Sequence, residues 1–429
     1  MSRFKPFSTA PVPERAILVG VDYGRRAWSL DDSMAELMRL AETDGAEVVA
    51  TLTQKLEAPV PKTFIGTGKA TELVSLVRTL NVDVVIFDDE LSPSQQANLE
   101  KLVGEPTKII DRTALILDIF GTHAKTHEGR LQVQLAQLQY VLPRLRGMWS
   151  HLVGEQTRGG IGSRFGQGES QLEVDRRLIR NRIAMLKREL RELEQRRNVQ
   201  SKLRWDSGVF SVALAGYTNA GKSTLLNKLT DASVYAKDEL FATLDPTTRA
   251  ITLDEGRRIT LTDTVGFIQK LPTTLIESFK STLAEAKAAD LILVIVDASD
   301  KNRDKEIEVV TSILADIHAS AQRQLLVFNK IDLLEHDEIL TLRASYPNAV
   351  CISAQEAIGL RELLYEITRI ASEGDAVISA LVPFEKGFLL KMVHERCRII
   401  REQYLAEGLQ ITVQADERMQ AILKPYRND

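Results

Sequence analysis

The stretch "FSVALAGYTNAGKSTLLNKL", residues 210–229, decides the fold of the central part of this chain. An apolar run, a loop and a helix-like segment follow one another, and the loop has the pattern Gly216-x-x-x-x-Gly221-Lys222-Ser223. The glycines let the backbone curl so that its N–H groups face phosphates, and the N-terminus of the helix adds a favourable dipole. We therefore predict a phosphate-binding loop, with Lys222 on the β- and γ-phosphates and the Ser223 hydroxyl on Mg²⁺.

A second stretch, "LTDTVGF" at residues 261–267, supplies further groups for the phosphates. It follows a strand-like run, which places Asp263 at a strand end, where its carboxylate can serve Mg²⁺ directly or in the second shell. Gly266 offers a backbone N–H to the γ-phosphate. Lys222, Asp263 and Gly266 are therefore predicted catalytic residues.

Two later motifs identify the base. In "LLVFNKID", residues 325–332, the Asp332 carboxylate can accept two hydrogen bonds from the N1–H and N2–H₂ edge of guanine. Adenine presents no such pair of donors, so the motif favours GTP over ATP. In "AVCISAQEAIG", residues 349–359, a backbone amide can meet guanine O6. The four motifs predict these nucleotide-binding residues: Gly216, Tyr217, Thr218, Asn219, Ala220, Gly221, Lys222, Ser223, Asp263, Thr264, Val265, Gly266, Asn329, Lys330, Ile331, Asp332, Ser353, Ala354 and Gln355.

The order of these motifs predicts an α/β domain over residues 205–372 that binds and hydrolyses GTP. Each motif follows a strand, and ligands bind at the carboxyl ends of strands in open α/β sheets. Ras-like signalling GTPases have a glutamine after the glycine of the second motif, where it orients the attacking water. Here the residue is Phe267, which can neither donate nor accept a hydrogen bond. Another group must therefore position the water.

Two details of the site stay open from the residues alone. "LFATLDPTTRA", residues 240–250, has to supply a threonine that ligates Mg²⁺ in the GTP state, and Thr243, Thr247 and Thr248 all qualify chemically. Asn219 stands where Ras-like proteins usually have glycine. It is either a residue tolerated in a turn or an oxygen ligand for a monovalent cation beside the phosphates.

Residues 1–111 are predicted to form a separate parallel α/β domain, because strand-like and helix-like segments alternate there. The strand-like runs are 16–23, 46–54, 82–89 and 107–111, and the helix-like segments are 33–45, 68–81 and 92–104. "IGTGKA", residues 65–70, is glycine-rich before a helix but lacks the full phosphate-loop spacing. We interpret it as a structural turn, with a second nucleotide site as the alternative.

Residues 112–204 carry two apolar seams with steps of four and three, which are typical of paired helices. The seams are Leu131, Leu135, Leu138, Leu142 and Leu145, and then Ile179, Ile183, Leu186, Leu190 and Leu193. Between them, the stretch 154–170 has glycine at positions 154, 159, 160, 162, 166 and 168, too many for a regular element. We predict two long antiparallel helices joined by a glycine-rich tip.

Positive charge is concentrated in this helical part. The whole chain has a formal net charge of −4 and does not look like a nucleic-acid binder, but residues 121–200 contain 15 Lys or Arg against 8 Asp or Glu. The helices alone fit a solvated coiled-coil surface. The tip, with Arg158 and Arg164 among glycines, suits close approach to phosphates.

The remaining features are those of a soluble cytoplasmic protein. Cys351 and Cys397 lack the spacing of a metal site and fit a reduced cytosol. The N-terminus has no apolar segment of a secretion signal, and no run approaches the length of a membrane span. We expect a monomer, because each domain is expected to be self-sufficient. Residues 373–429 are predicted to be a small βαβ-like unit with strands at 376–384 and 409–423 and a helix over 387–408.

Four stretches outside the GTP motifs resemble the HflX family of bacterial ribosome-associated GTPases, within the translation-factor-related class. They are "FIGTGKATEL" (64–73), "LSPSQQANLE" (91–100), "DRTALILDIFGTHAKTHEGRLQVQLAQLQYVLPRL" (111–145) and "GGIGSRFGQGESQLEVDRR" (159–177). The resemblance covers nearly all of 16–372, and the C-terminal unit resembles an appendix present in only part of the family. By the family's motif, Ser223 and Thr243 match the Mg²⁺ ligands, and Asn219 matches the asparagine of cation-dependent relatives, with K⁺ as the expected ion. The family's switch segment matches Phe241, Ala242, Thr243, Leu244 and Asp245.

The resemblance implies an N-terminal α/β domain, a helical hairpin and a Ras-like G domain. It also implies binding to the large (50S) ribosomal subunit, with the tip near the peptidyl-transferase centre, and GTP-dependent splitting or rescue of stalled or idle ribosomes under stress. The rRNA contacts expected from it are Arg158, Gly159, Gly160, Arg164, Arg176 and Arg177. Phe267 fits a family with a hydrophobic residue in place of the catalytic glutamine, so we expect docking on the subunit to complete the site.

Two other functions stay open. A nucleotide-driven RNA remodeller, which could also use ATP, would act on free structured RNA without whole ribosomes. A signalling GTPase would act on a protein partner. The chain outside residues 121–200 is net acidic, which is compatible with a protein partner but does not favour one.

Overall fold

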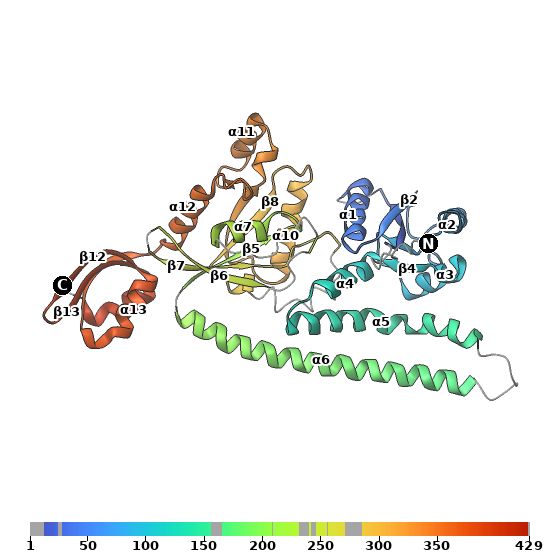
Figure 1. Cartoon of the computed structure of the whole chain (residues 1–429), viewed down its shortest axis with the longest axis horizontal. Helices are drawn as coiled ribbons and strands as arrows, with labels where there is room; N and C mark the ends of the chain where they lie inside the picture. Colours follow the sequence, from blue (N-terminus) through green and yellow to red (C-terminus); the bar gives the residue numbers. More distant parts are fainter. Residues whose placement is uncertain are drawn as a thin grey trace, which may run out of the picture. The chain divides into compact units, whose positions relative to one another are not determined.

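The structure is a computed structural model of the chain, and it describes residues 13–24, 28–155, 165–207, 209–230, 240–241, 246–254, 256–270 and 285–427. The chain divides into two compact units. Unit 1 comprises Met1–Glu189 and Lys270–Ser278, and unit 2 comprises Leu190–Gln269 and Phe279–Asp429. Figure 1 labels the helices and strands of both units.

Unit 1 contains a four-stranded parallel sheet, as the alternating sequence predicted. Its elements are β1 (Arg15–Asp22), α1 (Leu30–Thr43), β2 (Glu47–Lys55), α2 (Thr67–Leu80), β3 (Val84–Phe87), α3 (Pro93–Val103), β4 (Lys108–Asp111) and α4 (Arg112–His123). The strand order β2-β1-β3-β4 reverses direction between β1 and β3, the point where ligands bind in sheets of this kind. "IGTGKA" is the N-terminal turn of α2. The Gly66 N–H donates to Gln54 Oε1 at 2.9 Å, which favours the structural interpretation of this turn.

A buried arginine lies directly after β4, at the carboxyl edge of this sheet. Arg112 is 2% exposed, and its guanidinium donates to Glu36 at 2.6 Å and to Asp88 at 2.9 Å. Burial alone would raise the pKa of Asp88, but Arg112 and then Lys270 lower it to about 2. Because a buried charge that loses its partner is strongly destabilising, this cluster fixes α1, β3 and α4 relative to one another.

The helical part consists of α5 (His127–Glu155) and α6 (Phe165–Ser207). Helix α5 lies along α3 and α4, as Figure 1 shows. Arg144 donates to Gln96 Oε1 at 3.1 Å, and the Tyr140 hydroxyl donates to Asp111 at 2.9 Å. The first apolar seam therefore has the N-terminal α/β fold as a partner, which its spacing alone did not indicate.

The two helices run antiparallel, as predicted. Arg182 of α6 donates to Gln134 of α5 at 2.9 Å, and His127 at the start of α5 lies 3.6 Å from Glu189. The second seam is the sheltered side of α6 over residues 173–196, and Leu186 in its middle is fully buried. This part of α6 is therefore an amphipathic helix with a narrow apolar stripe.

The irregular stretch expected over 154–170 is shorter in the structure, and that expectation was wrong at both ends. Helix α5 continues to Glu155 and α6 begins at Phe165, so Gly166 and Gly168 are helical. Glycine lowers helix stability by only about 1 kcal/mol per residue, which a long flanking helix can absorb. The rest of the expected tip, residues 156–164, lies outside the described residues.

Unit 2 contains a six-stranded sheet in the order β10-β9-β8-β5-β7-β6, parallel except for the edge strand β6. We call its residues 209–371 the phosphate-loop domain. Its elements are β5 (Phe210–Gly216), α7 (Lys222–Thr230), β6 (Thr247–Thr252), β7 (Arg258–Asp263), β8 (Leu291–Asp297), α10 (Arg303–Asp316), β9 (Arg323–Asn329), η1 (Ile331–Leu333), α11 (His336–Ser345), β10 (Val350–Cys351) and α12 (Leu360–Ala371). The strand, loop and helix predicted from residues 210–229 are present.

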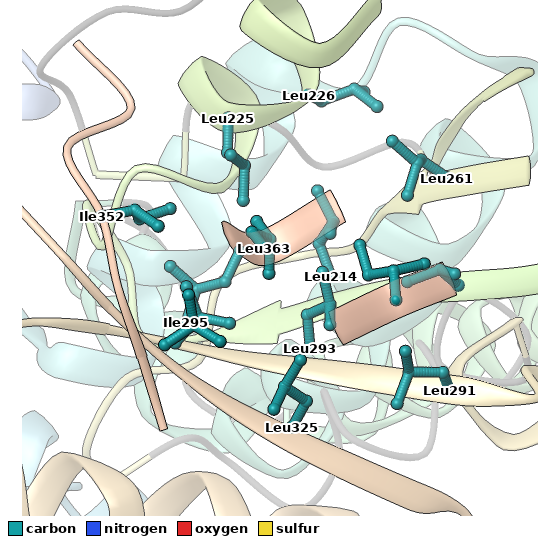
Figure 2. Packing of buried hydrophobic residues seen from close by; sticks show 14 of the residues in the cluster. Leu214, Leu225, Leu226, Leu261, Leu291, Leu293, Ile295, Leu325, Ile352 and Leu363 are labelled. Carbon is teal, nitrogen blue, oxygen red and sulfur yellow. The ribbon is translucent and has the colours of Figure 1, made fainter. Parts of the chain in front are cut away.

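Both faces of this sheet are buried. One apolar cluster joins the strands to α7 and α12 (Figure 2). Its labelled members are Leu214, Leu225, Leu226, Leu261, Leu291, Leu293, Ile295, Leu325, Ile352 and Leu363. The alternate residues of β8 belong to a second cluster with α10, which also contains Phe267 and Phe328. Because successive side chains of a strand point to opposite faces, the two clusters hold the sheet from both sides and fix its carboxyl edge.

Residues 376–427 form a small antiparallel sheet, β11-β13-β12, with helices. Its elements are β11 (Ala376–Val382), η2 (Phe384–Lys386), α13 (Gly387–Arg396), β12 (Arg398–Leu405), β13 (Gly408–Ala415), α14 (Glu417–Leu423) and η3 (Lys424–Tyr426). The prediction of one helix over 387–408 was wrong, because the backbone turns extended at Cys397 and 398–405 is a strand. The strand predicted over 409–423 ends at Ala415, where α14 takes over. The unit is α/β, but its sheet is antiparallel.

In the ranges that the structure describes, no helix is long and apolar enough to cross a membrane.

Candidate functional site

The phosphate loop leaves β5 at Gly216 and enters α7 at Lys222. Between them, Asn219 and Gly221 have φ angles of 60° and 91°, in the left-handed region. A Cβ on Gly221 would also collide with the side chain of Asn329, so glycine is required there by conformation and by space. The loop therefore has the tight curl that the sequence pattern predicted.

Lys222 lies in the curve of this loop and is 6% exposed. Its Nζ donates to the carbonyls of Gly216 at 3.1 Å and Tyr217 at 2.7 Å. Burial lowers the pKa of Lys222 to about 8, although the carboxylates of Asp263 and Glu306 favour its charged form. Glu306 is a buried residue of α10 that the sequence reasoning missed, because no motif indicates which helix lies against the loop.

The lowered pKa of Lys222 predicts a pH dependence of nucleotide binding. A phosphate beside the ammonium favours its charged form, so binding takes up a proton once the pH exceeds the pKa of the free protein. We expect the Kd for GDP to be flat below about pH 7.5 and to rise about ten-fold by about pH 9, where roughly one Lys222 in ten is charged. Titrations with fluorescently labelled GDP measure this. Lys222→Arg, which stays charged, should remove the rise, and a flat Kd in the unmodified protein would contradict the assignment.

Ser223 and Asp263 bring two oxygen ligands together beside the loop. The Ser223 hydroxyl donates to Asp263 Oδ2 at 2.6 Å, and Asp263 is fully buried at the end of β7. The next residue, Thr264, is fixed by a hydrogen bond from its hydroxyl to the Leu214 carbonyl at 2.7 Å. Mg²⁺ prefers oxygen ligands and is usually held by one or two carboxylates plus phosphates and water. The pair therefore fits a Mg²⁺ ion shared with a nucleotide.

Asn329 joins three of the four motifs. Its Nδ2 donates to the Ala220 carbonyl at 2.8 Å, and its Oδ1 accepts from the Ala354 N–H at 2.9 Å. The backbone amide expected at guanine O6 thus lies in the same site but is engaged by Asn329.

The residues that follow β9 form the side of the site expected for the base. Lys330 has a left-handed φ of 64°, and its Nζ lies 2.7 Å from Asp297 at the end of β8. Asp332 follows in η1 and is exposed, while Ser353 is fully buried. The exposed Asp332 carboxylate is therefore free of the core and accessible to the N1–H and N2–H₂ edge of a guanine.

The side chain of Phe267 is buried in the core of the phosphate-loop domain. It is 1% exposed and packs with α10 and β8 in the second core cluster. The backbone of Phe267 bonds the loop, where its N–H donates to the Gly216 carbonyl at 3.1 Å and its carbonyl accepts from the Thr218 N–H at 2.7 Å. A side chain in this position is a core residue and cannot orient a water molecule.

Two of the three threonines that could ligate Mg²⁺ in the GTP state lie in a strand of the sheet. Thr247 and Thr248 lie in β6, and the Thr248 hydroxyl is 2.9 Å from that of Thr262 on β7. Thr243 lies outside the described part of the chain, so its role as the Mg²⁺ ligand stays a prediction. Of the predicted switch segment, Phe241 is buried, and residues 242–245 lie outside the described part of the chain.

Of the predicted rRNA contacts, only Arg176 and Arg177 are described. Both lie on α6, where Arg176 is half-buried and Arg177 is exposed. Arg158, Gly159, Gly160 and Arg164 lie outside the described residues.

Three protein families match successive parts of the chain. "GTP-binding GTPase N-terminal" matches residues 31–121, "GTP-binding GTPase Middle Region" matches 123–204 and "50S ribosome-binding GTPase" matches 211–330. Among solved structures, a GTP-binding protein from the archaeon Sulfolobus solfataricus in complex with GDP is similar over 84% of this chain and 99% of that one, with 23% identity and a TM-score of 0.44.

Whole-length relatives are more similar. GTPase HflX of Caldanaerobacter subterraneus subsp. tengcongensis is 46% identical over 410 residues, which are 95% of this chain and 93% of that protein. GTPase HflX of Escherichia coli is 42% identical over 403 residues, 94% of this chain and 93% of that protein. Together with the phosphate loop and the guanine motifs on one sheet edge, this similarity shows that the chain belongs to the HflX family and is an enzyme that hydrolyses GTP.

Proposed function

We propose that this GTPase binds the large ribosomal subunit in the cytoplasm and splits or rescues stalled or idle ribosomes, particularly under stress. The observation that carries the proposal is the match of residues 211–330 to the family described as 50S ribosome-binding GTPase. The matched segment contains the phosphate loop, Asp263 and Asn329. The part of the chain that holds the phosphates is therefore within the part that resembles the family described as 50S ribosome-binding GTPase.

The exposed surface of α6 supports RNA as the target. Over residues 173–196 of this helix, seven Lys or Arg side chains are exposed against three exposed Glu side chains. The basic ones are Arg177, Arg180, Arg182, Lys187, Arg188, Arg191 and Arg196. A positively charged helix next to a glycine-rich, arginine-containing segment suits the phosphates of rRNA.

Hydrolysis needs a group that orients the attacking water, and the phenylalanine at position 267 cannot do this. Ser223 and Thr243 would hold Mg²⁺, and the bound ion neutralises charge developing on the β- and γ-phosphate oxygens. Lys222 holds the same phosphates, and the Gly266 N–H senses the γ-phosphate. Because the Phe267 side chain is buried, we propose that docking on the subunit orders the switch segments and completes the site.

A monovalent cation is the second proposed contribution. Asn219 is half-buried in the loop, with a left-handed backbone and an amide oxygen that suits K⁺. Such an ion would add positive charge beside the phosphates. In the assay below, replacing K⁺ by Na⁺ should lower turnover, and Asn219→Ala should make turnover insensitive to that exchange; an Asn219→Ala protein with unchanged K⁺ dependence would exclude this role.

The test is GTP turnover in K⁺ buffer with and without purified 50S subunits, with free rRNA as the comparison. We expect the subunit to raise turnover about ten-fold or more, because supplied catalytic groups are worth about 10³–10⁵ in other GTPases. Absence of stimulation, or equal stimulation by naked rRNA, would reject the proposal; the latter result would favour the RNA remodeller.

The basic surface is tested in the same assay with Arg177→Ser combined with Arg188→Ser. Both side chains are exposed, so we expect nucleotide affinity to stay unchanged while half-maximal stimulation needs more subunit. Arg361→Ser, on the exposed side of α12, is the matched control and should behave as the unmodified protein.

A further inference from the structure

The small sheet of residues 376–427 has one covered face. Alternate residues of its central strand β13, namely Leu409, Ile411 and Val413, are buried against α13 and α14 in one apolar cluster. Figure 1 shows α13 on one side of β12 and β13. The side chains between the buried ones point to the other side, here called the open face. It consists of Arg398, Arg401 and Gln403 of β12, Gln410, Thr412 and Gln414 of β13, and uncharged residues of β11.

A β-bulge places both arginines of β12 on this open face. In a regular strand, residues three apart point to opposite sides of the sheet. Here the pairing of β12 with β13 skips Ile400. Arg398 lies opposite Gln414, and Arg401 lies opposite Thr412. Because positions 412 and 414 share a face, the two exposed arginines stand in neighbouring rows, about 7 Å apart along the strand.

The open face carries these two cations and no carboxylate. Glu402, the acidic residue of β12, lies opposite buried Ile411 on the covered side, with its carboxylate 3.2 Å from His394 of α13. Charge on an edge strand also hinders pairing between sheets, but carboxylates serve that purpose as well. Around the arginines, the glutamine amides and the Thr412 hydroxyl can both donate and accept hydrogen bonds. The open face therefore offers charge and hydrogen bonds to a polyanion.

We propose that the open face binds single-stranded RNA, with Arg398 and Arg401 on neighbouring phosphates of one strand. Guanidinium groups bind phosphates through paired hydrogen bonds. The glutamine amides beside them can bond base edges and the ribose 2′-hydroxyl, which DNA lacks. The open face has no aromatic residue on which bases could stack, so binding should depend strongly on salt and little on base sequence. This surface goes beyond the proposed action on ribosomes and does not depend on it.

The test measures binding of a fluorescently labelled oligouridine of about 12 nucleotides to the full-length protein by anisotropy, at several KCl concentrations. Arg398→Ser combined with Arg401→Ser should weaken binding about ten-fold or more near 0.1 M salt. It should also reduce the slope of log K against log salt by about 1.4, because each phosphate contact on a single strand contributes about 0.7. Arg398→Lys combined with Arg401→Lys keeps both charges and should keep the slope.

Two controls isolate the open face from other cations. Lys386→Ser combined with Lys391→Ser removes two exposed cations from η2 and α13 of the same unit and should change the affinity by less than about two-fold. Because α6 also carries exposed arginines, the comparison is repeated in protein with Arg177→Ser and Arg188→Ser, where the loss should be the same. Ribosomal subunits and GTP take no part, so absent stimulation by 50S subunits leaves this test unaffected.

An unchanged salt slope in the protein with Arg398→Ser and Arg401→Ser would overturn the proposal. Equal binding of an oligodeoxyuridine of the same length would also overturn it, because the open face would then not distinguish RNA. Labelled polyglutamate is the third probe. If it binds as tightly as the oligouridine and is lost in the same variant, the open face receives an acidic protein segment and not RNA.

Discussion

Lys222→Ala is expected to lower GTP turnover at least about 1,000-fold, the largest loss that any single substitution in this chain should cause. Lys222 is the buried cation of the phosphate loop, and no second lysine or arginine stands in residues 216–223 to replace it. Removal of one preorganised donor at a developing charge typically costs about 10²–10³ in rate. Here the same ammonium also bonds the carbonyls of Gly216 and Tyr217, so the loop loses part of its shape as well.

Single-turnover hydrolysis, with nucleotide affinity measured in parallel, separates the two effects. The loss of loop shape should weaken GDP and GTP alike, and the loss of the donor should lower the rate at saturating GTP. Lys228→Ala is the matched control, because Lys228 lies six residues further along the same helix and is exposed. A Lys222→Ala protein within ten-fold of the normal rate would mean that the chemistry takes place elsewhere.

The local parts of this site could be predicted from the sequence because their chemistry is local. Three of its features follow from neighbouring residues: the curl of 216–221, the start of α7 at Lys222, and the position of Asp263 at the end of a strand. The same holds for Asp332, which follows shortly after a strand. The destination of Phe267 could not be predicted in the same way. Its type excludes a role with water, but only the packing of α10 and β8 determines that the ring enters the core.

Contacts between elements far apart in the sequence also could not be predicted. The spacing of the α5 seam identifies an apolar face, yet nothing in it indicates that α5 packs along α3 and α4. Nor does it indicate that Arg144 and Tyr140 of α5 bond Gln96 of α3 and Asp111 of β4. The error at 398–405 has a different cause. "RIIREQYL" follows a helix without glycine or proline, so the pattern favoured continuation of the helix. The adjacent β-branched residues Ile399 and Ile400, and Tyr404, are residue types enriched in strands and were the signal against it.

Asp332→Asn is expected to exchange guanine for xanthine specificity. The Asp332 carboxylate can accept from both N1–H and N2–H₂ of guanine, whereas an asparagine amide places a donor where the guanine amino group needs an acceptor. Two charge-assisted hydrogen bonds contribute about 1.5–3 kcal/mol each, so we expect GTP to bind at least about 100-fold more weakly. Xanthine carries a carbonyl at position 2, which the amide N–H₂ can serve, so XTP should gain about as much as GTP loses.

Because the Asp332 side chain is exposed, this substitution should leave the fold of the domain unchanged. Its side chain lies in η1 outside the core, and the residues that shape the site, Asn329 and Ala354, are bonded to each other and not to Asp332. The measurement is kcat/KM for GTP, XTP and ATP, with Asp337→Asn in the first turn of α11 as the control that removes a nearby exposed carboxylate. ATP should stay poor for both variants, because adenine has neither the donor pair nor the carbonyl. If Asp332→Asn still prefers GTP over XTP, other groups read the base. The preference for guanine inferred from Asp332 would then have to rest on the backbone around Ser353.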